Sequence, residues 1–420
     1  MTTDGGETVT ARYVIAGVGA LSAASTPDFE GAGSFRGRSY HTGQWPHEQV
    51  DFTGKRVGVI GTGASAVQVV PLVAQQASAL TVFQRTANYV VPARNGAVAE
   101  EVREARKRDY AALRDRIQHT LSGFDINPQP KMALESTDEE VRRTLTDRWE
   151  EGGFGFWFGT YGDIFIVDES NARVRDFVGA RIRETVRDPE TAELLVPKGY
   201  PFGVKRPPLD SGYYETFNLS HVRLVDVRSN PVARITPDGL RLSDGSEHEL
   251  DVIVYATGFD AMTGPLNRIE IRGRGGRLLR EKWSEGPRTY LGLMSSGYPN
   301  LFTITGPQSP SVLSNMPVSI EQHVDFVGRI IADLRERGAV TIEPTPEAED
   351  AWVRHNQETA AATLFPTADS WYTGANIPGK PRTFMPSLDF VGPYRQRCDD
   401  IAASGYPGFT ITMDREETAA

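Results

Sequence analysis

The stretch KRVGVIGTGASA, residues 55–66, decides the fold of this 420-residue chain. Its first half is rich in valine and isoleucine, which predicts a buried strand, and its second half spells G-x-G-x-x-A. We expect a helix over 64–76, with Pro71 inside it, and a second strand over 79–84, ALTVFQ. Strand, glycine turn, helix and strand are the context that a dinucleotide-binding site requires. The stretch therefore predicts an α/β, Rossmann-like domain.

The positions of this motif differ in what they do. Gly61 permits the tight turn, Gly63 lets a pyrophosphate approach the backbone, and Ala66 allows the helix to pack closely on the strand. The N-terminus of the helix offers unpaired N–H groups and the positive end of its dipole to phosphates. The predicted cofactor-binding residues of this unit are Gly61, Thr62, Gly63, Ala64, Ser65, Ala66 and Gln68.

The end of the second strand indicates which nicotinamide cofactor binds. An NAD site would carry an acidic residue there for the ribose 2′-hydroxyl, whereas this chain has Arg85 and Thr86. A guanidinium and a hydroxyl suit a 2′-phosphate, which favours NADPH; a surface arginine is the alternative interpretation. Upstream, GVGALS (17–22) also resembles a glycine turn, but Pro27 leaves no room for a helix, so we expect a strand end and a loop.

Composition and charge exclude several other classes of protein. With 39% hydrophobic and 24% charged residues, the chain has the composition of an ordinary globular protein. Its net charge of -10 argues against a broad electrostatic surface for nucleic acid. The single Cys398 leaves no partner for an internal disulfide and fits a reducing, cytoplasmic setting. No apolar run is long enough to span a membrane, and the histidines and cysteine show no metal-ligand spacing.

The segment just before the glycine turn, FRGRSYHTGQWP, carries a longer motif. It reads F-x-G-x-x-x-H-x-x-x-W-P and is filled by Phe35, Gly37, His41, Trp45 and Pro46. This pattern resembles the fingerprint of Baeyer–Villiger monooxygenases. Four further stretches are similar to the phenylacetone, cyclohexanone and steroid monooxygenase branch of that family: PKGYPFGVKRPP (197–208), VIVYATGFDA (252–261), NLFTITGPQSPSVLSNMPVSIEQHV (300–324) and SWYTGANIPGKPR (370–382).

The resemblance implies an activity and its cofactors. NADPH reduces FAD, the reduced flavin takes up O2, and the resulting peroxyflavin inserts one oxygen next to a ketone carbonyl, which gives an ester or a lactone. The partners implied are a small-molecule ketone and O2, with no nucleic acid and no membrane. The protein would supply binding, orientation and charge stabilisation, because the cofactor carries the difficult chemistry.

The resemblance also implies roles for particular residues. Arg206, in GVKRPP, matches the active-site arginine of the family, and an exposed basic pair with Lys205 is the alternative. Lys205 matches a residue that reaches the 2′-phosphate together with Arg85 and Thr86. His41 joins the two cofactor domains, which implies an orienting role in catalysis rather than proton transfer.

Two further segments are implied to contact the cofactors. Trp371 matches a tryptophan that touches the nicotinamide cofactor, and a core tryptophan is the alternative. The loop of Ser314, Asn315 and Met316 matches the family's loop that meets the flavin ring, and a Met316 that merely fills a gap in the packing is the alternative. The aromatic stretch FGFWFGTYGDIF (154–165) either lines an apolar pocket or packs in the core.

The family pattern divides the chain into three parts. Residues 1–27 and 259–420 correspond to an FAD-binding domain, 28–94 and 197–258 to an NADPH-binding domain, and 95–196 to a helical insertion. In the insertion, Thr137 and Glu140 predict a capping box, and apolar residues over 98–121 recur near a helical period. Family members begin with an FAD-binding βαβ unit that has its own glycine motif, and we expect this chain to begin after that unit, so that its FAD domain is incomplete.

Two other functions stay open at this point. One is a truncated, catalytically inactive protein that binds NADPH but has lost its FAD site. The other is an N-hydroxylating or sulfoxidising flavin monooxygenase from a neighbouring family, against which the tryptophan–proline ending of the 35–46 motif argues.

Overall fold

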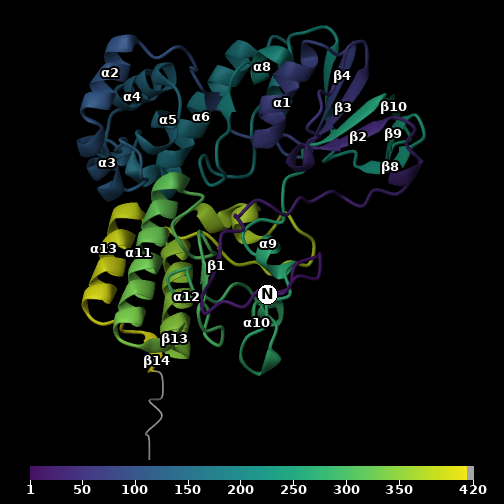
Figure 1. The fold of residues 1–420 in the computed structure, drawn as a ribbon. Helices are drawn as coiled ribbons and strands as arrows, with labels where there is room; N and C mark the ends of the chain where they lie inside the picture. Colours follow the sequence, from purple (N-terminus) through teal and green to yellow (C-terminus); the bar gives the residue numbers. More distant parts are fainter. Residues whose placement is uncertain (414–420) are drawn as a thin grey trace, which may run out of the picture.

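The structure is a computed structural model, and it describes residues 1–413. It has a five-stranded parallel sheet on one side, a helical region beside that sheet, and a second α/β unit below both (Figure 1). The mixed α/β architecture with parallel sheets confirms the predicted fold class.

The βαβ unit predicted from residues 55–84 forms the centre of the five-stranded sheet. Its strand order is β2-β11-β3-β4-β7, and every neighbouring pair is parallel. The elements are β2 (Arg38–His41), β3 (Arg56–Ile60), α1 (Ala64–Ala74), β4 (Ala79–Gln84), β7 (Val222–Asp226) and β11 (Val252–Tyr255). Helix α1 ends two residues earlier than predicted and contains Pro71. The central strands are buried on both faces, as parallel sheets require.

An antiparallel meander packs on one face of this sheet, opposite the face that α1 covers. It consists of β8 (Val232–Thr236), β9 (Gly239–Leu242) and β10 (Glu247–Glu249). Leu240 of the meander, Phe83 of β4 and Ile253 of β11 share one buried cluster. The meander therefore belongs to the same packed unit as the sheet.

Residues 95–196 are mostly helical, as predicted. The helices are α2 (Glu100–Arg108), α3 (Tyr110–His119), α4 (Asp138–Glu151), α5 (Gly155–Phe158), α6 (Asp168–Thr185) and α7 (Pro189–Leu195). The capping box that begins α4 is confirmed: the Glu140 amide donates to the Thr137 hydroxyl, and the Thr137 amide donates to the Glu140 carboxylate.

The apolar period over 98–121 is misleading in one respect. The segment is helical, but it breaks at Asp109 into two helices. Val102 and Tyr110 are 44% and 55% exposed, whereas Leu113 and Ile117 are half-buried, so only part of the apolar face is covered. The physical reason is that α2 lies at the edge of the molecule beside α3 (Figure 1), and it is α3 that packs on to α13 (Val391–Ala403).

The second unit is built on two small sheets and three long helices. Strands β1 (Val14–Ala16) and β12 (Leu301–Thr303) are parallel, whereas β13 (Ala339–Pro344) and β14 (Phe409–Met413) are antiparallel. Helices α11 (Met316–Glu336), α12 (Pro346–Ala361) and α13 (Val391–Ala403) lie side by side (Figure 1). The shorter elements of the chain are β5 (Val91–Pro92), β6 (Leu209–Asp210), α8 (Tyr213–Thr216), α9 (Gly264–Asn267) and α10 (Leu279–Lys282). As predicted, residues 17–27 contain no helix.

The chain crosses between the two units twice, and the two crossings are hydrogen-bonded to each other. The Ser25 amide donates to the Gly258 carbonyl over 3.0 Å, and the Asp260 amide donates to the Ala23 carbonyl over 2.8 Å. The Thr257 hydroxyl donates to the Ser25 carbonyl over 2.6 Å. We call this pair of segments, 23–27 and 257–262, the linker. Within residues 1–413, no helix combines the length and apolar character of a membrane span.

Candidate functional site

The glycine turn between β3 and α1 has the geometry that its sequence predicts. Gly61 has φ 111°, and a Cβ there would lie 2.5 Å from the Ala256 carbonyl oxygen, so only glycine fits. A Cβ on Gly63 would meet nothing within 4 Å, and no side chain caps α1 at that residue. Ala66 is fully buried against the strands. The N-terminus of α1 therefore faces open space with amides available for a phosphate.

Two polar side chains, one in the turn and one in the first turns of α1, bond to nearby backbone carbonyls. The Thr62 hydroxyl donates to the Thr86 carbonyl over 2.6 Å and thereby joins the turn to the end of β4. The Gln68 amide nitrogen donates to the Ala64 carbonyl one helical turn before it, over 3.0 Å. Ser65 is half-buried and Ala64 is exposed beside Gly63. Thr62 and Gln68 can thus serve a cofactor by holding the shape of the turn.

Three basic side chains converge where β4 and β7 end. Gln84 is in register with Asp226, and the Val227 amide donates to the Gln84 carbonyl over 2.8 Å, which places Arg228 beside Arg85 and Thr86. Lys205 approaches from the 197–208 segment. Burial lowers the pKa of Lys205 to about 8; Asp369 opposes this shift, while Arg85 and Arg228 add to it.

Arg228 is a residue that the sequence analysis missed. It follows a strand end, as Arg85 does, but only the strand order makes the two strand ends neighbours. Lys205 itself is held by an aromatic ring, because its Nζ lies 4.2 Å from the ring centroid of Tyr200. The result is a cationic surface beside the open N-terminus of α1.

Arg206 points into a different environment from its neighbour. Its guanidinium carbon lies 5.0 Å from the ring centroid of Phe154, and its Nη1 is 3.4 Å from the Val312 carbonyl oxygen. Burial raises the pKa of Tyr372, and the positive charge of Arg206 opposes that shift. Four segments therefore meet around this guanidinium: 154–165, 197–208, 311–316 and 371–373.

The aromatic stretch 154–165 packs in and against the core, which is one of the two interpretations that its sequence left open. Phe156 and Trp157 are buried in the main core. Phe154 and Phe158 are only half-buried, and with Phe124 they form an aromatic cluster whose ring centroids are 5.6–6.3 Å apart. Because Phe154 also covers Arg206, this cluster forms an apolar wall beside a cation.

The loop implied to meet a flavin is held by its own polar side chains. The Ser314 hydroxyl lies 2.9 Å from the Ser311 carbonyl and 2.7 Å from the Ser319 hydroxyl. The Asn315 side-chain nitrogen donates to the Gly123 carbonyl over 3.0 Å. Met316 begins α11, is half-buried, and packs against the main core. No side chain caps α11 at Asn315, and because Pro317 has no N–H, the amides left for a ligand are those of Met316 and Val318.

His41 lies at the end of β2, next to the linker. Its Nδ1 accepts from the Gly43 amide over 3.0 Å, which places the proton of the neutral ring on Nε2. That Nε2 is buried and has no partner among residues 1–413. The ring stands edge-on to Phe259 of the linker, with centroids 6.0 Å apart. Trp45 packs instead against Tyr40 and Phe52.

Trp371 lies on a short 3-10 turn, Trp371–Thr373, and is half-buried. The Ser370 hydroxyl begins this turn by accepting from the Tyr372 amide over 3.2 Å. Tyr372 is fully buried, and its carbonyl accepts from the Met385 amide over 2.8 Å. The indole is therefore carried by a turn whose next residue is anchored in the core.

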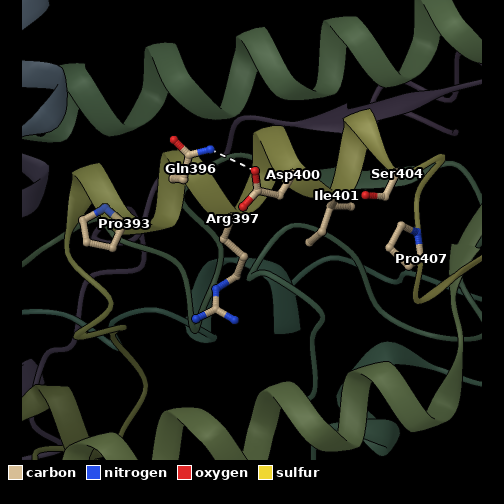
Figure 2. Close-up of a pocket in the computed structure, with 7 residues that line it drawn as sticks. All are labelled: Pro393, Gln396, Arg397, Asp400, Ile401, Ser404 and Pro407. Atoms are coloured by element: carbon tan, nitrogen blue, oxygen red, sulfur yellow. Dashed lines mark hydrogen bonds between the residues drawn. The ribbon is translucent and has the colours of Figure 1, made fainter.

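A surface hollow runs along α13 (Figure 2). It is lined by Pro393, Gln396, Arg397, Asp400, Ile401, Ser404 and Pro407. None of these is a predicted site residue. In residues 1–413 we also find no group of three or more His, Cys, Asp or Glu side chains that could hold a metal ion.

Known proteins resemble this chain over nearly its whole length. No protein-family model matches it. A protein named Baeyer–Villiger monooxygenase from Pseudooceanicola batsensis is 43% identical over 418 residues, which cover 99% of this chain and 75% of that protein.

Solved structures share its fold. A steroid monooxygenase in its oxidised state, bound to NADP, is 47% identical with a TM-score of 0.92, covering 98% of this chain and 77% of that one. The OTEMO crystal structure, a complex with FAD and NADP, is 38% identical with a TM-score of 0.94, covering 97% and 77%.

Proposed function

The chain belongs to the Baeyer–Villiger monooxygenase family, and from that premise we propose that it inserts one oxygen atom of O2 next to a ketone carbonyl. The product would be an ester or a lactone, and FAD and NADPH are the cofactors. The observation that carries the proposal is the adjacency of two basic sites on one segment. Lys205 joins a cationic surface beside a phosphate-binding turn, and Arg206 faces an apolar wall.

The residues of the NADPH site fit their ligand. We assign the pyrophosphate to the amides from Thr62 to Ala66, Ser65 included, at the open end of α1. Gly61, whose amide donates to the Phe83 carbonyl, shapes the turn, and Gln68 supports the helix through the Ala64 carbonyl. The 2′-phosphate would lie among Arg85, Thr86 and Lys205, because a dianion satisfies cations that otherwise repel each other.

We assign the nicotinamide end of that cofactor to Trp371. Its ring is available for stacking, and its turn lies near Arg206 through Tyr372.

The FAD site of the chain includes the loop before α11. Ser314, Asn315 and Met316 follow Val312, whose carbonyl lies 3.4 Å from Arg206 Nη1, and no side chain caps the start of α11. When bound, FAD accepts hydride and activates O2, and the chain holds and shields it. Because the Ser314 hydroxyl bonds to the Ser311 carbonyl and the Asn315 side-chain nitrogen donates to the Gly123 carbonyl, we expect these residues to contact a flavin mainly through backbone atoms and packing.

Arg206 is the residue that we propose acts on the reacting oxygen atoms. Its cation is permanent, and the Phe154 ring lowers the local dielectric around it. A carbonyl oxygen that gains negative charge during the reaction would be stabilised by this fork of N–H donors. The aromatic cluster of Phe124, Phe154 and Phe158 would bind the apolar part of the ketone and exclude water.

We propose that His41 keeps the two cofactor units in a working orientation. Its buried ring contacts the linker through Phe259, and its Nδ1 is occupied by the Gly43 amide. On the same grounds we divide the chain into FAD-domain segments 1–27 and 259–420, NADPH-domain segments 28–94 and 197–258, and a helical insertion 95–196.

The test is oxygen transfer by the purified chain, reconstituted with FAD. We expect a flavin absorption spectrum, NADPH oxidation that depends on added ketone, and an ester that carries one ¹⁸O atom from ¹⁸O₂. Arg206→Met should still bind NADPH but form no ester. A chain that binds NADP⁺, stays colourless with FAD and forms no ester would refute the enzyme function and favour the inactive NADPH-binding alternative.

A further inference from the structure

The residue Trp371 belongs to a loop that is closed at its base. The Met385 amide donates to the Tyr372 carbonyl over 2.8 Å, and the Thr383 amide donates to the Thr373 carbonyl over 3.3 Å. At the first bend Gly374 has φ 75°, and a Cβ there would lie 2.9 Å from the Pro381 carbonyl. Residues 371–385, which we call the Trp371 loop, are therefore held together as one compact segment.

Two side chains of this loop attach it to the linker. Lys380 Nζ lies 2.6 Å from the Asp260 carboxylate and donates to the Ala261 carbonyl over 2.7 Å. The Asn376 side-chain nitrogen donates to the Phe259 carbonyl over 2.8 Å. The side chains of Lys380 and Asp260 are only 11% and 26% exposed. Partial burial strengthens the pair relative to a surface ion pair.

The same linker residues contact the segment that carries His41. A Cβ on Gly43 would lie 2.5 Å from the Phe259 ring, and the His41 ring stands edge-on to it. The Asp260 amide in turn donates to Ala23 of the outgoing crossing. A single stretch, Phe259 to Ala261, therefore touches the His41 segment on one side and the Trp371 loop on the other.

We propose that Lys380 is a positioning residue that couples the Trp371 loop to the linker through Asp260. The position of Trp371 then follows the relative orientation of the two cofactor units, because the linker is the segment that such a change must move. The inference rests on the proposed function in one respect, the assignment of Trp371 to the nicotinamide cofactor. Lys380 itself is not assigned to any cofactor or substrate.

The coupling is tested in the full chain by two measurements that need no turnover. The first is the rate at which chymotrypsin cleaves after Trp371 and Tyr372, and the second is the dissociation constant of NADP⁺ from calorimetry. We expect Lys380→Met to accelerate cleavage and to weaken NADP⁺ binding, each by about tenfold, the size expected when a charge-assisted hydrogen bond is lost. Lys380→Arg should restore most of both values.

The matched control is Arg268→Met. Arg268 donates to the Ala24 carbonyl over 3.0 Å, so it touches the linker but makes no hydrogen bond to the Trp371 loop in the described residues. We expect this variant to keep the wild-type cleavage rate and the wild-type NADP⁺ affinity. Asp260→Asn should reproduce the Lys380→Met effects, and the double variant should add little to either single change.

The outcomes separate this inference from the proposed function. The proposed coupling would be overturned if Lys380→Met left the cleavage rate and the NADP⁺ affinity unchanged. It would also be overturned if Arg268→Met changed both values as much as Lys380→Met does. Should Lys380→Met fail to fold, Asp260→Asn decides by the same two measurements. A wild-type chain that does not bind NADP⁺ would refute the assigned NADPH site, whereas the cleavage rates would still decide the coupling.

Discussion

The lowered pKa of Lys205 makes NADP⁺ binding a proton-linked reaction. Burial brings this pKa to about 8, so that about three quarters of the free chains carry a neutral lysine at about pH 8.5. A 2′-phosphate dianion beside the amine favours its charged form. Binding of NADP⁺ at about pH 8.5 should therefore take up about 0.7 proton per chain. Binding of NAD⁺, which lacks this phosphate, should be accompanied by almost no proton uptake.

Calorimetry in two buffers of different ionisation enthalpy measures this uptake directly. The observed binding enthalpy changes with the ionisation enthalpy of the buffer, and the slope equals the number of protons bound. Lys205→Met should abolish this slope for NADP⁺ binding, while the slope for NAD⁺ binding should stay unchanged. The affinity of wild type for NADP⁺ should also fall about tenfold between about pH 7 and about pH 9, as the lysine loses its proton.

The prediction is refuted if the wild-type chain takes up no proton when it binds NADP⁺, or if Lys205→Met takes up as many protons as wild type.

A folding measurement gives an independent check of the pKa of Lys205. The pKa of Lys205 is about 8 in the folded chain and about 10.4 in the unfolded chain. Between these two pH values the unfolded state binds more protons than the folded state, so the free energy of unfolding should rise with pH. The rise attributable to this lysine is about 3 kcal/mol at most, and it should be absent in Lys205→Met.

Four further substitutions test other parts of the structure. Arg228→Ala should weaken NADP⁺ binding about fivefold and leave NAD⁺ binding unchanged, as measured by calorimetry; an equal loss for both would remove Arg228 from the phosphate site. Arg206→Lys keeps the charge but loses the planar fork, so the rate of ester formation should fall about a hundredfold while the dissociation constant of NADPH changes little. Gly43→Ala places a Cβ 2.5 Å from the Phe259 ring and should lower the free energy of unfolding by about 1–3 kcal/mol in urea, since the crowding has no easy relief. Thr137→Ala removes the cap of α4 and should cost about 1 kcal/mol in the same assay, with NADP⁺ affinity as the value that must not move.

Local patterns in the sequence predicted the parts of the site that are local in structure. The strand, the glycine turn and α1 are consecutive, and the need for glycine at position 61 follows from a backbone conformation that no other residue adopts easily. The capping box of α4 is likewise a contact across three residues. Such features depend on backbone preferences and short-range hydrogen bonds, which a sequence displays directly.

Contacts between distant segments were decided by the tertiary structure. Arg228 joins Arg85 because β7 lies next to β4, although 143 residues separate the two arginines (228 minus 85). Lys380 likewise reaches Asp260 across 120 positions of the chain (380 minus 260), and Phe154 covers Arg206 across 52 (206 minus 154). Exposure is also a tertiary property, since Val102 and Tyr110 keep a helical period but have no layer packed on them. The sequence by itself determined which local units form. The order of the strands and the packing of the layers determined which of their side chains meet, because that order is set by the burial of whole faces rather than by any one segment.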